Sequence, residues 1–129
     1  MKVDYTGGIG FNVSARNHQV LVDLPQDKGG QDKGMTPPEL FMASLGSCIG
    51  VYVVRYCQNA KLDATDLKID LDWKLSDDKT KIAEISVVMS LPRADVGRRE
   101  TAVLQAAHHC LIHNTILGNP QIHITLAKK

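Results

Sequence analysis

Residues 36–58 read TPPELFMASLGSCIGVYVVRYCQ, and the rest of the chain must be arranged around this stretch. It begins with a threonine hydroxyl, two prolines and the acid Glu39, which are typical of a helix N-terminus. We therefore expect one long helix here. The stretch is apolar nearly all round, so the helix should be packed on several sides. Gly46 and Gly50 share one face, where the backbone of another element should cross.

The overall composition is that of an ordinary globular domain. Apolar residues make up 43% and charged residues 22% of the 129 positions, which argues against disorder. A formal net charge of +1 argues against a nucleic-acid-binding surface. A chain of this length can bury one core, so we expect a single domain over residues 1–129.

Two segments bear on a membrane location. Residues 40–54 are uncharged for 15 positions, whereas a spanning helix needs about 20. Near the N-terminus, Asp4 and two glycine clusters interrupt what would be the apolar part of a signal peptide. We therefore expect a buried core helix, no membrane span and a cytoplasmic protein.

Strand patterns precede the long helix. A period-2 pattern places Val20, Val22 and Leu24 on one face of residues 19–24, and a turn at 16–18 joins them to residues 9–15, which predicts a hairpin. Residues 25–36 are rich in Gly, Asp and Lys and predict an exposed loop.

The elements after the helix complete the fold class. Residues 67–75 alternate without a fault and predict a half-buried strand that forms a second hairpin with residues 82–91. Asp95 is placed to cap a helix over residues 98–109, and residues 121–126 predict a last strand. This order predicts an α+β domain in which antiparallel sheets pack around the long helix. The apolar helix should also be covered by a second copy of the chain, as a homodimer.

Three cysteines are candidates for chemistry. An odd number at wide spacing does not resemble a disulfide framework, so each is either an inert core residue or a reactive thiol. Cys57 follows Cys48 by nine residues, on the opposite helix face, and is predicted to serve packing. Desolvation alone would raise the pKa of Cys48, so a nucleophilic Cys48 needs a cation. Arg55, about 10 Å along the helix, and Arg16 are both open candidates.

Cys110 lies in the segment HHCLIHNT, residues 108–115. Its three imidazoles are compatible with a metal site, with assistance to thiol ionisation, or with hydrogen bonding at a helix end. The paired spacing of structural zinc sites is missing, so we expect no metal.

Both cysteine segments resemble those of the OsmC/Ohr family. Residues 34–48, GMTPPELFMASLGSC, are similar to its T-x-P-E-x-L-x-x-A-x-x-x-C segment. Residues 107–115, AHHCLIHNT, resemble its second cysteine segment, usually C-P-V, which follows some sixty residues later. The order of elements agrees over nearly the whole chain. The resemblance implies an OsmC-like α+β fold and an intertwined homodimer with two sites at the subunit interface.

The resemblance also implies a reaction. In the well-studied branches the first cysteine attacks the O–O bond of an organic hydroperoxide and becomes a sulfenic acid, and the second condenses with it to a disulfide. By position, Cys48 would be the peroxidatic and Cys110 the resolving cysteine, and an external dithiol would reset the pair. Apolar walls would favour lipid-like peroxides, and neither a metal nor an organic cofactor is needed.

The peroxidase branches hold the thiolate with an arginine from the N-terminal region and a glutamate before the long helix. The resemblance assigns these roles to Arg16, the only arginine in that region, and to Glu39. Glu39 precedes Cys48 by nine residues, whereas the common pattern of the peroxidase branches has ten, so that Pro38 aligns with their acid. Leu111 stands where proline is usual.

Three other functions remain open from the sequence. The same dimer could bind a small apolar ligand or sense oxidants without turnover. Cys110 and His113 could act as a cysteine-histidine hydrolase or acyl-transfer pair, although no oxyanion-hole signature or orienting acid is evident. The cysteines could also be purely structural. Repeated turnover with a dithiol reductant separates the peroxidase from these alternatives.

Overall fold

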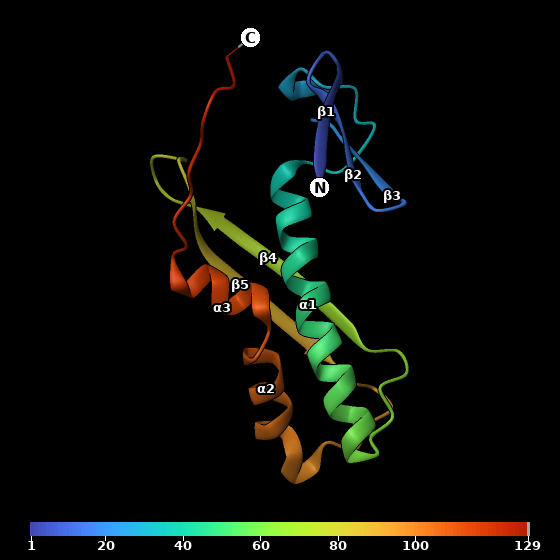
Figure 1. The fold of residues 1–129 in the computed structure, drawn as a ribbon. Coiled ribbons are helices and arrows are strands. Elements are labelled where there is room, and N and C mark those ends of the chain that lie inside the picture. The colour runs from blue at the N-terminus through green and yellow to red at the C-terminus, as the bar shows by residue number, and fades with distance from the viewer. Residues whose placement is uncertain (129) are drawn as a thin grey trace. The chain divides into compact units, whose positions relative to one another are not determined.

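The computed structural model describes residues 1–128, which divide into two compact units, Met1–Ala43 and a second unit that begins at Ser44 (Figure 1). Two small antiparallel sheets and a long helix confirm the predicted α+β class. In chain order the elements are β1 (Lys2–Gly7), β2 (Gly10–Ala15), β3 (His18–Val22), η1 (Gln26–Lys28), α1 (Pro37–Ala60), β4 (Lys68–Leu75), β5 (Ile82–Ser90), η2 (Gly97–Arg99), α2 (Glu100–His108) and α3 (Leu111–Gly118).

The first unit is built on the three-stranded sheet β1-β2-β3. The predicted hairpin is confirmed as β2 and β3, which pair Val13 with Val20 and Ala15 with His18. Arg16 takes a positive φ of 54° in the tight turn between them. Strand β1 adds to the free edge of β2 and extends the hairpin to a meander.

A buried carboxylate organises the loop that follows β3. Asp23 is only 5% exposed, and it accepts hydrogen bonds from the N–H groups of Leu24, Gln31 and Lys33 at 2.8, 3.0 and 3.2 Å. These bonds, that of Leu24 foremost, lower the pKa of Asp23 despite its burial. The predicted loop is thus exposed but held in one conformation.

Helix α1 begins where the sequence predicts and ends two residues later than expected. The Thr36 hydroxyl accepts the N–H of Glu39 at 3.4 Å, and the Glu39 carboxylate accepts the N–H of Thr36 at 2.7 Å. This reciprocal pair is a capping box, which satisfies two N–H groups that a helix start leaves free. It fixes the point at which the chain becomes helical.

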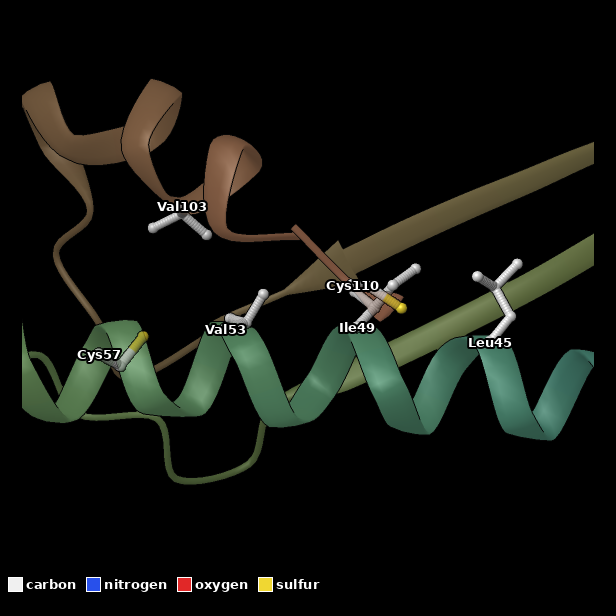
Figure 2. Packing of buried hydrophobic residues seen from close by; sticks show 6 residues of the cluster. All are labelled: Leu45, Ile49, Val53, Cys57, Val103 and Cys110. Atoms are coloured by element: carbon white, nitrogen blue, oxygen red, sulfur yellow. The ribbon is translucent and has the colours of Figure 1, made fainter. Parts of the chain in front are cut away.

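Among residues 1–128, α1 is the one helix that is long and apolar enough to cross a membrane. The core helix of a globular protein meets the same criteria of length and composition. In the second unit, Leu45, Ile49, Val53 and Cys57 of α1 are buried (Figure 2). They pack with Val103 and Cys110. This burial agrees with the prediction of a core helix.

Strands β4 and β5 form the predicted second hairpin, with Trp73 paired to Ile85 and Leu71 to Val87. A Cβ atom on Gly46 would lie 2.6 Å from Leu71 Cδ1, and one on Gly50 would lie 3.3 Å from Ile69 Cδ1. The glycine face of α1 therefore has the predicted close neighbour. The approaching atoms belong to side chains of β4, however, and not to a crossing backbone.

The C-terminal third differs from the sequence prediction in three ways. The expected helix over residues 98–109 is divided into η2 and α2, and no side chain caps either N-terminus, so the prediction of an Asp95 cap was wrong. Helix α3 was not predicted. The strand predicted over residues 121–126 is absent, and Ile122, Ile124 and Leu126 are 80%, 91% and 93% exposed. A strand requires a hydrogen-bonded neighbour, and residues 1–128 of one chain supply none for this segment.

Candidate active site

Two of the predicted site residues come together in the second unit. Cys48 lies half-buried in the middle of α1, and Cys110 is fully buried between α2 and α3. Cys110 is the N-cap of α3 and has an extended backbone, with φ −57° and ψ 128°. Helix α2 has therefore ended before Cys110, and the change of direction brings the thiol to α1 beside Ile49 (Figure 2).

The two thiols influence each other's ionisation and shift in opposite directions. Burial opposes ionisation of the Cys48 thiol. The Cys110 thiol and the backbone N–H groups of Ile112 and Leu111 outweigh it by stabilising the thiolate, and the pKa of Cys48 is lowered. Cys48 is therefore the better nucleophile, because the thiolate is the reactive form.

Cys110 has the opposite tendency. Burial raises the pKa of the Cys110 thiol, and the hydrogen bond and charge of Cys48 raise it further. One sulfur thus tends to lose its proton while its neighbour keeps one. Both thiols are free in this structure. A thiol of lowered pKa beside a second thiol is able to form a disulfide once the first sulfur has been oxidised.

The backbone groups that lower the pKa of Cys48 belong to the start of α3, a helix that sequence reasoning missed. Residues 111–117 carry apolar side chains at helical spacing, and this signal could have indicated the helix. Its third residue, His113, donates its N–H to the Cys110 sulfur at 3.4 Å. The His113 ring Nδ1 lies 3.2 Å from the carbonyl oxygen of His108, so the imidazole connects the end of α2 to the first turn of α3.

The other two predicted site residues belong to the first unit. Arg16 is exposed in the turn between β2 and β3. Glu39 is exposed, and its carboxylate is engaged in the capping box. The hydrogen bonds from Thr36, with the nearby charge of Lys28, lower the pKa of Glu39. The alternative cation, Arg55, is exposed on α1.

Cys57 is excluded from the thiol pair by its position. It is 0% exposed in the core of the second unit, and burial raises the pKa of its thiol. The prediction that Cys57 serves packing agrees with this environment. Across residues 1–128, no three His, Cys, Asp or Glu side chains gather closely enough to hold a metal ion.

A largely apolar groove of about 500 Å³ lies in the same unit. Leu45 and Ile49 of α1 form part of its wall, together with side chains of β5, α2 and α3. Neither Cys48 nor Cys110 is among its lining residues. The groove could hold a hydrocarbon group, since clefts of this size and lining are typical of sites for small molecules.

The chain is similar to a known protein family and to solved structures. The family model described as OsmC-like protein matches residues 30–125. A Psychrobacter arcticus protein named for osmotic stress and detoxification has a TM-score of 0.80 at 17% identity, covering 88% of this chain and 85% of that chain. An organic hydroperoxide resistance protein from Elizabethkingia anophelis has a TM-score of 0.65 at 20% identity, with 92% and 90% covered. No curated protein matches the sequence at a significant level.

Proposed function

Because the chain belongs to the OsmC-like protein family, we propose that it is a thiol-dependent peroxidase that reduces organic hydroperoxides. Cys48 is the peroxidatic cysteine of this proposal and Cys110 the resolving cysteine. The observation that carries it is the packing of Cys48 against the core cluster that contains Cys110, where the pKa of Cys48 is lowered and that of Cys110 is raised. Two structural neighbours, from Legionella pneumophila and Elizabethkingia anophelis, are named organic hydroperoxide resistance proteins.

The proposed reaction has three steps. The Cys48 thiolate attacks the outer oxygen of the hydroperoxide, the O–O bond breaks, and the departing alkoxide takes a proton to become an alcohol. The Cys110 sulfur then attacks the Cys48 sulfenic acid, forming the disulfide and releasing water. An external dithiol reduces the disulfide and is itself oxidised. Two thiols and one peroxide thus give one disulfide, one alcohol and one water, and no metal or organic cofactor takes part.

We propose that the substrate is an apolar hydroperoxide. Cys48 packs against a core of apolar side chains, and burial is the largest single influence on its pKa. Such surroundings favour a hydrocarbon group over the small, strongly hydrated hydrogen peroxide. A cytoplasmic protein that removes lipid-like peroxides would serve in oxidative-stress defence.

Arg16 and Glu39 are proposed as further site residues that orient the thiolate, on the family resemblance. Their part is tested by Arg16→Gln and Glu39→Gln in the peroxide assay. Loss of turnover with unchanged folding supports the role. Glu39→Gln can still accept a hydrogen bond from Thr36 through its amide oxygen, so this variant preserves part of the capping box while it removes the charge.

We propose that the protein acts as a homodimer. Ile122, Ile124 and Leu126 alternate along an exposed segment that pairs with no strand of residues 1–128, and Val51 of α1 is 48% exposed. A second chain could cover these apolar groups. Analytical ultracentrifugation should give twice the mass of one chain. Monomers at all accessible concentrations would contradict this proposal.

The function is tested by following the consumption of cumene hydroperoxide and hydrogen peroxide with a dithiol reductant. Wild-type protein should turn over repeatedly and prefer the organic peroxide. Cys48→Ser should abolish turnover, and Cys110→Ser should stop catalytic cycling with the dithiol after Cys48 has been oxidised. Cys57→Ser is the matched control and should remain active. Cys57 takes no part in the proposed reaction, because it is buried in the core and burial raises the pKa of its thiol.

The groove supports a second candidate function, a dimer that binds a small apolar ligand or senses oxidants without turnover. Well-folded wild-type protein that fails to consume either peroxide would favour this function. A fluorescent fatty acid is a suitable probe, since its chain matches the apolar lining. Binding of this probe to wild-type protein, and weaker binding to Ile116→Asn in the groove wall, would support ligand binding.

A further inference from the structure

We propose that the apolar groove of the second unit binds a long-chain carboxylate, whose hydrocarbon chain lies on the apolar lining and whose carboxylate is held by the imidazoles of His108 and His113. Such a site rests on the second candidate function, the binding of a small apolar ligand, and names the class of that ligand. It is separate from the thiol pair, since neither Cys48 nor Cys110 lines the groove.

Helices α2 and α3 each present one face to the groove. Each contributes residues at positions i, i+3 and i+4, which lie on the same side of a helix. These residues are Leu104, Ala107 and His108 of α2, and His113, Ile116 and Leu117 of α3. Leu104 and Leu117 are 47% and 71% exposed, so apolar surface along the groove remains open to a ligand. The two histidines belong to the ends of the helices that follow each other in the chain.

The polar side chains of the groove lining are Glu84, His108 and His113. Glu84 of β5 is already paired, because the Nζ of Lys74 in β4 lies 2.9 Å from its carboxylate. The two imidazoles lie together, with ring centroids 5.2 Å apart. The His113 Nδ1 is 3.2 Å from the carbonyl oxygen of His108, so Nε2 is the ring nitrogen that can face a ligand. A few polar groups that converge in an apolar cleft orient a small molecule there.

The imidazole pair favours an anion over a neutral head group. Two neighbouring imidazoles repel each other when both are protonated, and a negative group beside them offsets that repulsion. A carboxylate accepts hydrogen bonds through both of its oxygens, so it can serve two ring N–H groups at once. The apolar lining favours a hydrocarbon chain. A fatty acid combines both groups in one molecule.

Binding of a carboxylate should therefore be linked to protonation of the imidazoles. The other charged or titratable groups beside them carry little net charge at neutral pH. Glu84 and Lys74 offset each other, and α1 faces the groove with apolar side chains. The Cys110 thiol accepts the His113 N–H, and burial raises its pKa, so it stays protonated. Because the ordinary pKa of histidine is about 6.5, a carboxylate should bind more tightly at about pH 6 than at about pH 8.

The test uses a fatty acid with a dansyl group at the end of its chain, and the methyl ester of the same molecule, which has no charge. Fluorescence titration of the wild-type protein at about pH 6 and about pH 8 gives the Kd of each probe. The carboxylate should bind about tenfold more tightly at the lower pH, the effect of one hydrogen bond between charged groups. The ester should bind equally at both.

Variants assign this preference to the imidazoles. The double variant His108→Gln with His113→Gln should weaken binding of the carboxylate about tenfold at the lower pH and leave binding of the ester unchanged. His109→Gln is the matched control, because His109 is an exposed neighbour that does not line the groove, and it should bind both probes like wild type.

Equal affinity of the wild-type protein for the two probes at the lower pH would overturn the proposal, and this comparison needs no variant. A folded double variant that keeps the preference for the carboxylate would overturn it as well. If neither probe binds, the candidate function of ligand binding fails together with the carboxylate site. If both probes bind equally, that function stands and only the role of the imidazoles is refuted. Peroxide turnover is measured separately, so these outcomes do not decide the peroxidase proposal.

Discussion

Truncation of Val103 would test how Cys110 is held at the site. Val103 is the one buried residue of α2 and is 5% exposed, and it packs in the core beside Val53 and Cys57. Val103→Ala removes two methyl groups, which corresponds to about 1.6 kcal/mol of transfer free energy. The cavity left behind increases the loss of unfolding free energy to about 2 to 3 kcal/mol.

Leu104→Ala on the same helix is the matched control. It removes one carbon more than Val103→Ala, but Leu104 is 47% exposed, so the cost should stay near 1 kcal/mol. Urea unfolding of both variants measures the difference, and thermal unfolding should show a melting temperature about 10 °C lower for Val103→Ala. Cys110 should also be labelled faster in folded Val103→Ala, because α2 leads directly to it.

A larger loss of unfolding free energy in Leu104→Ala than in Val103→Ala would contradict this prediction. That result would mean that the groove lined by Leu104 is filled in solution and that burial in a single chain does not rank these side chains.

Two further predictions concern His113 and Cys57. His113→Asn should retain a donor to the His108 carbonyl, whereas His113→Ala should lose it. Iodoacetamide should therefore label Cys110 about fivefold faster in His113→Ala than in His113→Asn. Equal labelling rates in the two variants would contradict a role for this hydrogen bond. Folding raises the pKa of Cys57, so the folded state keeps this proton more tightly and unfolding free energy should fall as pH rises above the ordinary thiol pKa. Cys57→Ala should reduce that alkaline loss in urea unfolding at neutral and alkaline pH, and an unchanged pH slope would show that Cys57 does not cause it.

Features that depend on neighbouring residues could be predicted from the sequence alone. Thr36 and Glu39 mark the start of α1 because a capping box is closed within four residues. Alternation over residues 67–75 and 82–91 predicted β4 and β5 because every second side chain of a strand faces the same side. The cysteine motifs pointed to Cys48 and Cys110 through a family resemblance, and the family model supports that membership.

The tertiary structure decided what depends on residues far apart in the chain. Cys48 packs against the core cluster that contains Cys110, and the pKa values of the two thiols shift in opposite directions. Both features depend on how the segment around α3 packs against α1. From the sequence, only a cation could be named as support for the thiolate, because a backbone N–H is present at almost every position and only its direction gives it a function. The predicted strand over residues 121–126 was wrong for the related reason that a strand depends on a partner, which no periodic pattern can supply.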